Sequence, residues 1–250
     1  MTDARGGDDE RLVSALLDVV AVMDRLRSPG GCPWDAEQTH ASLAPYAVEE
    51  AHEVAEAAEA GDLPALREEL GDLLLQVLFH ARVAQEAPDG EAFDLADVAS
   101  VLAAKLRRRH PHVFAVGPDG PSVTDADGVN RQWDAIKAAE RADRSGGGER
   151  GDGAGAPASV LDGVPATLPA LMRAQKVLGR ARKAGIAVGP VFGDDPVDPE
   201  DPDDAASEIG AELLAVVARA AAAGVDAEAA LRAQVRGVVA QVHDAEANAR

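Results

Sequence analysis

Five acidic side chains are spaced so that they could hold a divalent cation. Glu49, Glu50 and Glu53 lie in EEAHE, and Glu69 and Asp72 lie in EELGD. Helical residues three or four positions apart share a face, so each set is expected to project its carboxylates together. Oxygen ligands without interleaved Lys or Arg suit Mg²⁺ or Mn²⁺ rather than zinc. The alternative is that these are solvated surface acids, which the EEAHE spacing taken by itself favours.

The second acidic set lies on a segment that is apolar around most of a helical circumference. Leu, Val and Phe between positions 66 and 79 leave only a narrow stripe for Glu69, Asp72 and Gln76. Such a helix is expected to be buried, so the stripe indicates a polar cleft or an oligomer interface. Carboxylates about 4 Å apart repel by about 4 kcal/mol per pair at an effective dielectric constant near 20, which calls for a nearby cation. Magnesium held by a few carboxylates keeps positions for water and phosphates, which predicts phosphoryl or nucleotidyl chemistry.

The elements that must position these acids are predicted to be helices. Apolar spacing predicts helices over residues 10–27 and 43–60, the second ending at Gly61. Asp62 is a suitable N-cap for a third helix that runs to about residue 87. The two acid-bearing helices are therefore expected to form a hairpin that brings their acidic faces together.

The rest of the chain also favours an all-α fold. Asp94 is predicted to begin a fourth helix that ends in a basic run before Pro111, and a loop over 115–128 leads to a shorter helix with Trp133 and Lys137. No run of alternating β-branched residues indicates a strand. Later helices are predicted over residues 168–183, 205–223 and 226–247.

Composition divides the chain into two helical domains. We expect a first domain over residues 10–142, a flexible Gly/Ala linker over 143–160 and a second domain over 161–250. The linker is rich in Gly and cannot bury enough apolar surface to order itself. Residues 194–204, DDPVDPEDPDD, are expected to form a solvated acidic loop within the second domain.

Charge and cysteine content restrict the classes of function. The chain has 24 Lys and Arg against 44 Asp and Glu, a net charge of −20, which disfavours binding to nucleic acid. Its one cysteine, Cys32, cannot form an intrachain disulfide. The acidic start resembles no secretory signal, and no apolar stretch approaches the ~18 residues of a membrane span. We therefore expect a cytoplasmic protein that does not bind membranes.

Several motifs together resemble the MazG family of nucleoside triphosphate pyrophosphohydrolases. Besides EEAHE and EELGD, they are CPWDAEQTH at 32–40, RRHPHVF at 108–114 and WDAIK at 133–137. The resemblance implies an all-α helical bundle of two repeats, of which the first is catalytic. It also implies Mg²⁺-dependent cleavage of nucleoside triphosphates to the monophosphate and pyrophosphate.

The resemblance also implies roles for individual residues. The implied metal ligands are Glu50, Glu53, Glu69 and Asp72. Glu49 is implied as a further ligand or as the group that orients the attacking water, which makes Glu49, Glu50 and Glu53 the catalytic set. The implied substrate contacts are Lys105 and Arg109 at the phosphates, and Trp133 and Lys137 near base and phosphate. Without the acids, Lys105 and Arg109 are explained by the helix dipole, and Trp133 by core packing.

The second half resembles a second repeat that has lost its acids. Glu208-Ile209-Gly210-Ala211 matches Glu69-Leu70-Gly71-Asp72, with Ala where the aspartate belongs. We therefore expect a degenerate repeat with a regulatory or assembly role. The apolar third helix further predicts a homodimer or higher homo-oligomer, since one copy does not supply enough cover for it. The alternative to an enzyme is a non-catalytic helical scaffold for dimerisation or nucleotide sensing.

Overall fold

The protein is described by a computed structural model that covers residues 3–114, 159–189 and 202–249, and isolated positions between 125 and 140. All regular structure in these residues is α-helical and none of it is a strand, which confirms the expected all-α fold. The chain forms two compact units, Met1–Ile136 and Lys137–Arg250. The predicted linker over 143–160 lies outside the described residues except at its last two positions.

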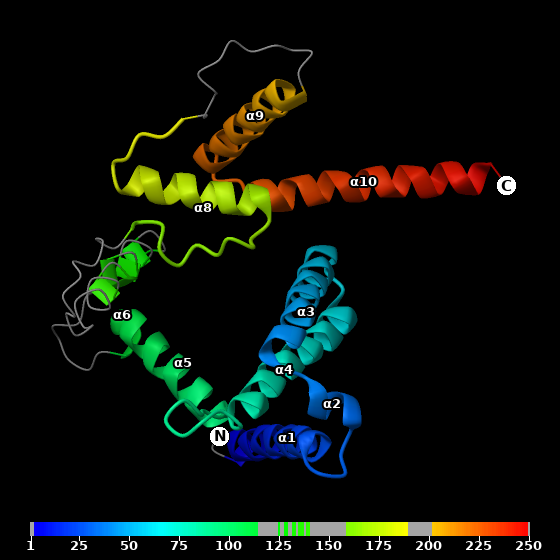
Figure 1. Ribbon diagram of the computed structural model, residues 1–250, viewed down its shortest axis with the longest axis vertical. Helices are drawn as coiled ribbons and strands as arrows, with labels where there is room; N and C mark the ends of the chain where they lie inside the picture. The colour runs from blue at the N-terminus through cyan, green and yellow to red at the C-terminus, as the bar shows by residue number, and fades with distance from the viewer. Residues whose placement is uncertain are drawn as a thin grey trace. The chain divides into compact units, whose positions relative to one another are not determined.

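The first unit is built around an antiparallel pair of helices (Figure 1). The helices of this unit are α1 (Asp3–Arg27), α2 (Pro33–Glu37), α3 (His40–Ala60), α4 (Leu63–Ala84), α5 (Leu95–Arg109) and α6 (Pro111–Phe114). Helix α4 packs along α3 and also contacts α1 and α5, so it is the central element of the unit. The described positions from 128 to 140 are helical, as predicted for the segment with Trp133.

The turn between α3 and α4 follows the chemistry predicted for it. Gly61 has φ +72°, a left-handed conformation that glycine adopts without the strain a Cβ brings. Its N–H donates to the carbonyl oxygens of Ala57 and Ala58. Asp62 then caps α4 by accepting a hydrogen bond of 3.1 Å from the N–H of Ala65. Because only these two residues separate the helices, α3 and α4 must run antiparallel and side by side.

Other helix ends agree with the prediction in part. Asp94 caps α5 as predicted, accepting a 3.0 Å hydrogen bond from the N–H of Asp97. Helix α3 begins three residues earlier than predicted, because Thr39 forms a capping box with Ser42. Helix α4 ends at Ala84 rather than near residue 87, and the short helices α2 and α6 are absent from the prediction because they are too short to show a period.

The core of the first unit lies where α1, α3 and α4 meet. Met23, Leu43, Leu78 and Phe79 are buried together, and partly buried residues surround them: Val19, Val20, Val83 and Leu95. Leu43 is the most buried of these, with 1% of its surface exposed. This core fixes α4 against α1 on one side and α3 on the other.

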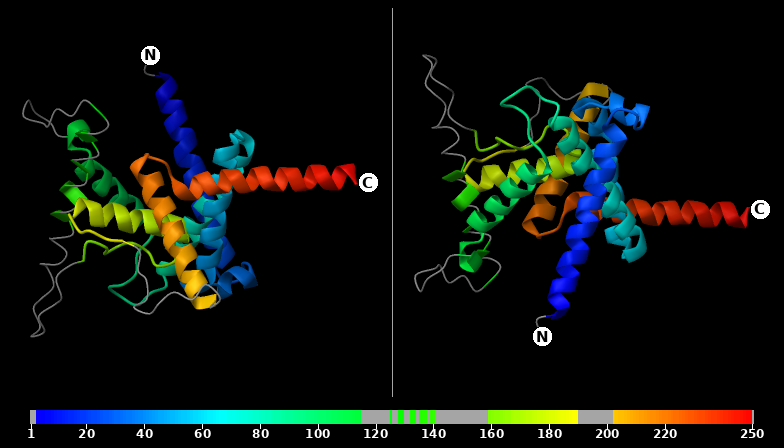
Figure 2. Two further views of the ribbon diagram at one scale, coloured as in Figure 1. Left: turned by 90° about the horizontal axis from the view of Figure 1, so that it is seen from above. Right: turned by 90° about the horizontal axis from the view of Figure 1, so that it is seen from below.

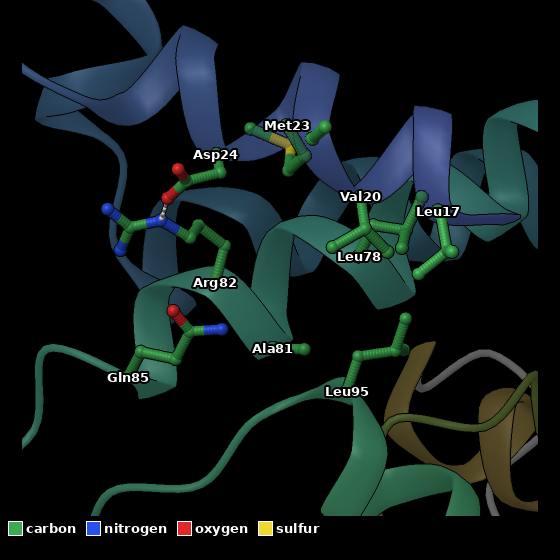
Figure 3. Close-up of a pocket in the computed structure, with 10 residues that line it drawn as sticks. Leu17, Val20, Met23, Asp24, Leu78, Ala81, Arg82, Gln85 and Leu95 are labelled. Carbon is green, nitrogen blue, oxygen red and sulfur yellow. Dashed lines mark hydrogen bonds and ion pairs between the residues drawn. The ribbon is translucent and has the colours of Figure 1, made fainter.

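Ion pairs add to the contact between α1 and α4. Arg27 of α1 donates two 2.9 Å hydrogen bonds to the Glu86 carboxylate, just beyond α4. Arg82 of α4 lies 2.8 Å from Asp24 of α1 and 2.9 Å from Glu86. Figure 3 shows Asp24 and Arg82 paired at the edge of a pocket between α1, α4 and α5. Only 6% of the Arg27 side chain is exposed, so its positive charge has little contact with water and is stabilised by the Glu86 carboxylate.

The third predicted helix, α4, is only partly buried within the single chain. Leu78 and Phe79 of α4 are buried, but Leu70, Leu74 and Val77 are 49%, 39% and 40% exposed. The reason is that α1, α3 and α5 contact only part of the circumference of α4. An apolar strip along α4 therefore faces outward in this chain.

The second unit contains α8 (Ala170–Lys183), α9 (Pro202–Ala222) and α10 (Ala227–Asn248). The Gln175 side chain joins them, since it donates to the carbonyl oxygen of Val225 and accepts from the N–H of Ala227 at the start of α10. Helix α10 extends well past α8 and α9 (Figure 2). None of the described helices is long and apolar enough to cross a membrane.

One predicted boundary in the second unit is wrong. Helix α9 begins at Pro202, inside the segment 194–204 predicted as an acidic loop. Proline fits the first turn of a helix, where its missing N–H is no loss, so the Pro and Asp content of this segment is compatible with a helix start. Residues 194–201 lie outside the described part of the chain.

Candidate active site

Three carboxylates from α3 and α4 converge in the first unit. Glu50, Glu69 and Asp72 each offer one oxygen, and these three atoms lie within 4.8 Å of one another. Glu50 and Glu69 are half-buried and Asp72 is exposed. The acids predicted to meet across the helical hairpin therefore do so for these three residues.

The convergence follows from the position of the turn. Glu50 lies eleven residues before Gly61 and Asp72 lies eleven residues after it, so the two face each other across the antiparallel helices. Glu53 and Glu69 lie eight residues before and after the same glycine. The hairpin thus stacks two layers of acids, Glu53 with Glu69 and Glu50 with Asp72, about one helical turn apart.

Partial burial and mutual repulsion within these layers raise the pKa of two carboxyls. Partial burial, and then the charges of Asp72, Glu53 and Glu49, raise the pKa of Glu50 above its ordinary value. Partial burial, and then the charges of Glu53 and Asp72, raise the pKa of Glu69. Every charged group that shifts these two pKa values is an acid, so the pair stands in a negative local potential.

Glu53 and Glu49 lie beside this cluster. The Glu53 side chain raises the pKa of both Glu50 and Glu69, so it lies near them, although it is not one of the three residues whose oxygens converge. Glu49 is exposed, and its charge has the smallest of the named effects on the pKa of Glu50. Glu53 therefore influences two members of the cluster, whereas Glu49 influences only Glu50 and lies on the outer side.

The donor set fits a hard divalent cation. All the converging atoms are carboxylate oxygens, the ligand type preferred by Mg²⁺ and Mn²⁺. A cation at this point is expected to offset the repulsion that raises the pKa of Glu50 and Glu69. Glu50 and Glu69 come from different helices, so a cation is also expected to join α3 to α4.

The predicted substrate-binding residues lie on other elements. Lys105 and Arg109 are half-buried on α5, whose described contacts are with α4 and α6. Trp133 packs edge-on against His110 with ring centroids 4.9 Å apart, next to the end of α5. Trp133 therefore contacts the residue that follows Arg109 in the sequence. Neither Lys105 nor Arg109 is among the groups that shift the pKa of Glu50 or Glu69. Lys137 is the first residue of the second unit, and its role stays a prediction.

Two polar features near the cluster have no role in the sequence prediction. Gln76 on α4 is 93% buried, with 7% of its surface exposed, and its Oε1 accepts no hydrogen bond. The rings of His40 and His80 stack, and their Nδ1 atoms lie 2.8 Å apart. Partial burial, and then His40, lower the pKa of His80. The sequence places Gln76 on the polar stripe with Glu69 and Asp72 but gives it no role. The contact between the two histidines cannot be predicted from the sequence, because it depends on how α3 packs against α4.

The second unit does not repeat the carboxylate cluster within its described residues. Helix α9 carries Glu208, and Ala211 stands at the position that corresponds to Asp72. The group of three possible metal ligands found in the described chain lies in the first unit. The expectation of a degenerate second repeat is therefore consistent with the described part of α9.

Comparison with known proteins finds similarity over most of the chain. Residues 38–114 match a family model described as the MazG nucleotide pyrophosphohydrolase domain. A Thermotoga maritima protein named nucleoside triphosphate pyrophosphohydrolase/pyrophosphatase MazG is 35% identical over 89% of this chain and 82% of its own length. An uncharacterized 26.1 kDa protein of Streptomyces cacaoi is 46% identical over 87% of this chain and 77% of its own length.

Other relatives are longer than this chain. The nucleoside triphosphate pyrophosphohydrolase of Escherichia coli K12 is 45% identical over 177 residues, which cover 69% of this chain and 60% of that protein. The matched part therefore spans less than two thirds of the E. coli protein. The match of residues 38–114 includes both acid-bearing helices and α5.

Proposed function

This chain belongs to the MazG family, and we propose on that basis that it hydrolyses nucleoside triphosphates to nucleoside monophosphates and pyrophosphate. The observation that carries the proposal is the convergence of Glu50, Glu69 and Asp72 within 4.8 Å. Polyphosphates need a cation to approach such a negative site, and a divalent ion supplies it. The proposed role is to remove unwanted nucleotides from the nucleotide pool.

The carboxylates have distinct proposed roles. Glu50, Glu53, Glu69 and Asp72 hold Mg²⁺, with Mn²⁺ as the alternative ion. When bound, the ion polarises phosphate oxygens and lowers the pKa of water. Glu49, on the outer side of the cluster, orients the attacking water and accepts its proton.

The reaction requires an exchange of one bond at the α-phosphorus. The water oxygen forms a bond to this phosphorus while the bond to the oxygen that bridges to the β-phosphate breaks, and pyrophosphate leaves with that oxygen. Lys105 and Arg109 neutralise charge on the leaving phosphates, which is the main way proteins stabilise phosphoryl transfer.

The outward apolar strip on α4 supports a homodimer. Leu70 and Leu74 of this strip are 49% and 39% exposed, although apolar side chains of this size are normally buried. A second copy of the chain supplies an identical strip, and pairing two such surfaces about a twofold axis is the commonest mode of association. We therefore propose that α4 of one copy packs against a second copy.

A pyrophosphate-release assay tests the proposed activity. The full chain is incubated with a mixture of nucleoside triphosphates, with Mg²⁺ or with a chelator. We expect Mg²⁺-dependent pyrophosphate release, and a loss of at least a hundredfold in Glu53→Gln and Asp72→Asn, because each removes a charged ligand. Glu56→Gln is the matched control, since Glu56 is an exposed acid one turn further along α3.

Two outcomes contradict the proposed activity. Unchanged turnover in Asp72→Asn removes the assignment of the metal site. Absence of pyrophosphate release from every triphosphate, with Mg²⁺ binding retained, favours the non-catalytic scaffold over the enzyme.

A further inference from the structure

Gln76 of α4 is an uncharged polar residue with 7% of its surface exposed, and it is the buried polar residue in the described part of the chain. Its Oε1 has no hydrogen-bond partner. Buried polar atoms are nearly always paired in proteins, because an unpaired one has lost water without compensation. An orphaned carbonyl oxygen in a residue that lines a pocket gains a partner when the side chain turns toward a hydrogen-bond donor bound there.

Gln76 lines a pocket with a volume of about 290 Å³. The apolar walls are formed by Ala47 of α3, Val77 of α4, Val98 of α5 and Phe93, which lies just before α5. His80 is the other polar side chain in the lining, and it is engaged with His40 through Nδ1 atoms 2.8 Å apart. A small apolar pocket with one unpaired acceptor is typical of a site for a planar heterocycle with an N–H donor.

The pocket lies next to the carboxylates along the α3–α4 hairpin. Gln76 lies one helical turn after Asp72 on α4, and Ala47 lies about one turn before Glu50 on α3. Because α3 and α4 are antiparallel, Ala47 and Gln76 form the next layer of the hairpin after Glu50 and Asp72. This layer lies about 6 Å further along the helix axes. A sugar separates the base of a nucleotide from its α-phosphate by a comparable length.

We propose that this pocket binds the base of the nucleotide substrate, and that Gln76 Oε1 accepts a hydrogen bond from an exocyclic amino group of the base. The inference rests on the proposed function, because it takes the phosphates to lie at the carboxylates. The apolar walls contact the faces of the ring, for which aromatic side chains such as Phe93 are suited. Bases that carry an amino group, such as adenine and cytosine, are the favoured class, since a base without one leaves Oε1 buried and unpaired.

The pocket between α1, α4 and α5 offers a contrast. It has a similar volume, about 300 Å³, but its charged residues Asp24 and Arg82 bind each other at 2.8 Å (Figure 3). Its charged groups are therefore already paired, and its other polar side chain, Gln85, is exposed to solvent rather than buried. The Gln76 pocket differs from it in this respect and in its place beside the carboxylates.

Binding of matched analogues tests the proposal without relying on turnover. The full chain with Mg²⁺ is titrated calorimetrically with α,β-methylene ATP and with the same analogue of purine riboside triphosphate, which lacks only the amino group. We expect the amino-bearing analogue to bind about fivefold to tenfold more tightly, the range of one hydrogen bond. We expect the same ratio in kcat/KM for ATP against purine riboside triphosphate.

The variant Gln76→Met removes the acceptor while keeping the length of the side chain. We expect the affinity ratio to fall to about one. We also expect an unchanged or higher Tm, because an apolar side chain relieves the orphaned oxygen. Gln85→Met is the matched control, since Gln85 is an exposed glutamine at the end of the same helix. It is expected to retain the preference for the amino group.

Several results overturn the base pocket. These are an equal affinity for the two analogues in the unaltered chain, a ratio that survives in Gln76→Met, or a fall in Tm and a changed oligomeric state in that variant. The last result makes Gln76 a structural contact. Failure of both analogues to bind overturns the pocket and the proposed function together.

Failure of the pocket and failure of the proposed function give different patterns. Pyrophosphate release from both triphosphates with equal kcat/KM removes the pocket and leaves the function. A retained, Gln76-dependent affinity ratio without any pyrophosphate release removes the function and leaves the pocket as a nucleotide-sensing site.

Discussion

Glu50 and Asp72 lie eleven residues on either side of Gly61, and their carboxylate oxygens come within 4.8 Å of each other across α3 and α4. The length of chain on each side of the turn is therefore matched, so that the hairpin alone sets two acids face to face. Glu53 and Glu69 are matched in the same way at eight residues. The position of one glycine thus fixes the geometry of the site.

Replacing Gly61 is expected to weaken this hairpin. At φ +72°, Gly61→Ala adds a Cβ in the left-handed region, which costs about 1 kcal/mol of folding stability. Gly71→Ala is the control, because Gly71 is helical and has open space around it, so alanine is expected to add about 0.5–1 kcal/mol. Urea unfolding measures both, and equal stability of the two variants contradicts the account of the turn.

Acid is expected to loosen the contact between α1 and α4. The hydrogen bonds from Arg27, with its charge and that of Arg82, hold the pKa of Glu86 below its ordinary value of 4.5. A lowered pKa in the folded protein means that this stabilisation is present above pH 4.5 and is lost as the pH falls through the folded pKa, below 4.5.

The variant Glu86→Gln measures this contribution. It is expected to lose about 1 kcal/mol of stability at pH 7, a value reduced for solvent screening because the Glu86 side chain is 45% exposed. The difference from the unaltered protein should shrink at pH 3.5. Glu91→Gln, at an exposed acid beyond α4, is expected to change little at either pH. A deficit in Glu86→Gln that is the same at both pH values contradicts the role of this carboxylate.

The sequence predicts those parts of the fold that local chemistry determines. Gly61, Asp62 and Asp94 mark helix ends because their backbone or side-chain preferences act within a few residues. The meeting of Glu50 with Asp72 is also predictable, since a two-residue connection leaves the helices no other arrangement. These features need no knowledge of the rest of the molecule.

Features that depend on tertiary packing are not predictable in this way. The burial of Gln76 and the contact of His40 with His80 arise from how α3, α4 and α5 meet. The exposure of the strip on α4 depends on packing as well, because apolar periodicity shows that a face needs a partner but not whether the same chain or a second copy supplies it. Pro202 lies in a segment that the sequence predicts as a loop. A Pro- and Asp-rich sequence is equally suited to a loop and to the first turn of a helix.

A charge in the apolar strip is expected to disrupt the proposed homodimer. Leu74→Glu places a carboxylate on the outward face of α4, where Leu74 is 39% exposed. We expect the dimer to dissociate at least tenfold more readily, since an unpaired charge is poorly tolerated at an interface. Leu63→Glu is the control, because Leu63 is 72% exposed at the first turn of α4, where an acid suits the helix dipole. Sedimentation equilibrium that gives the same oligomeric state for both variants contradicts this interface.

Direct titration with Mn²⁺ is the most direct test of the carboxylate site, with bound ion measured by electron paramagnetic resonance. The account predicts at least one Mn²⁺ per chain in the unaltered protein, an affinity at least tenfold weaker in Asp72→Asn, and no change in Glu56→Gln. It is contradicted if Asp72→Asn and the unaltered chain bind Mn²⁺ with the same stoichiometry and the same affinity.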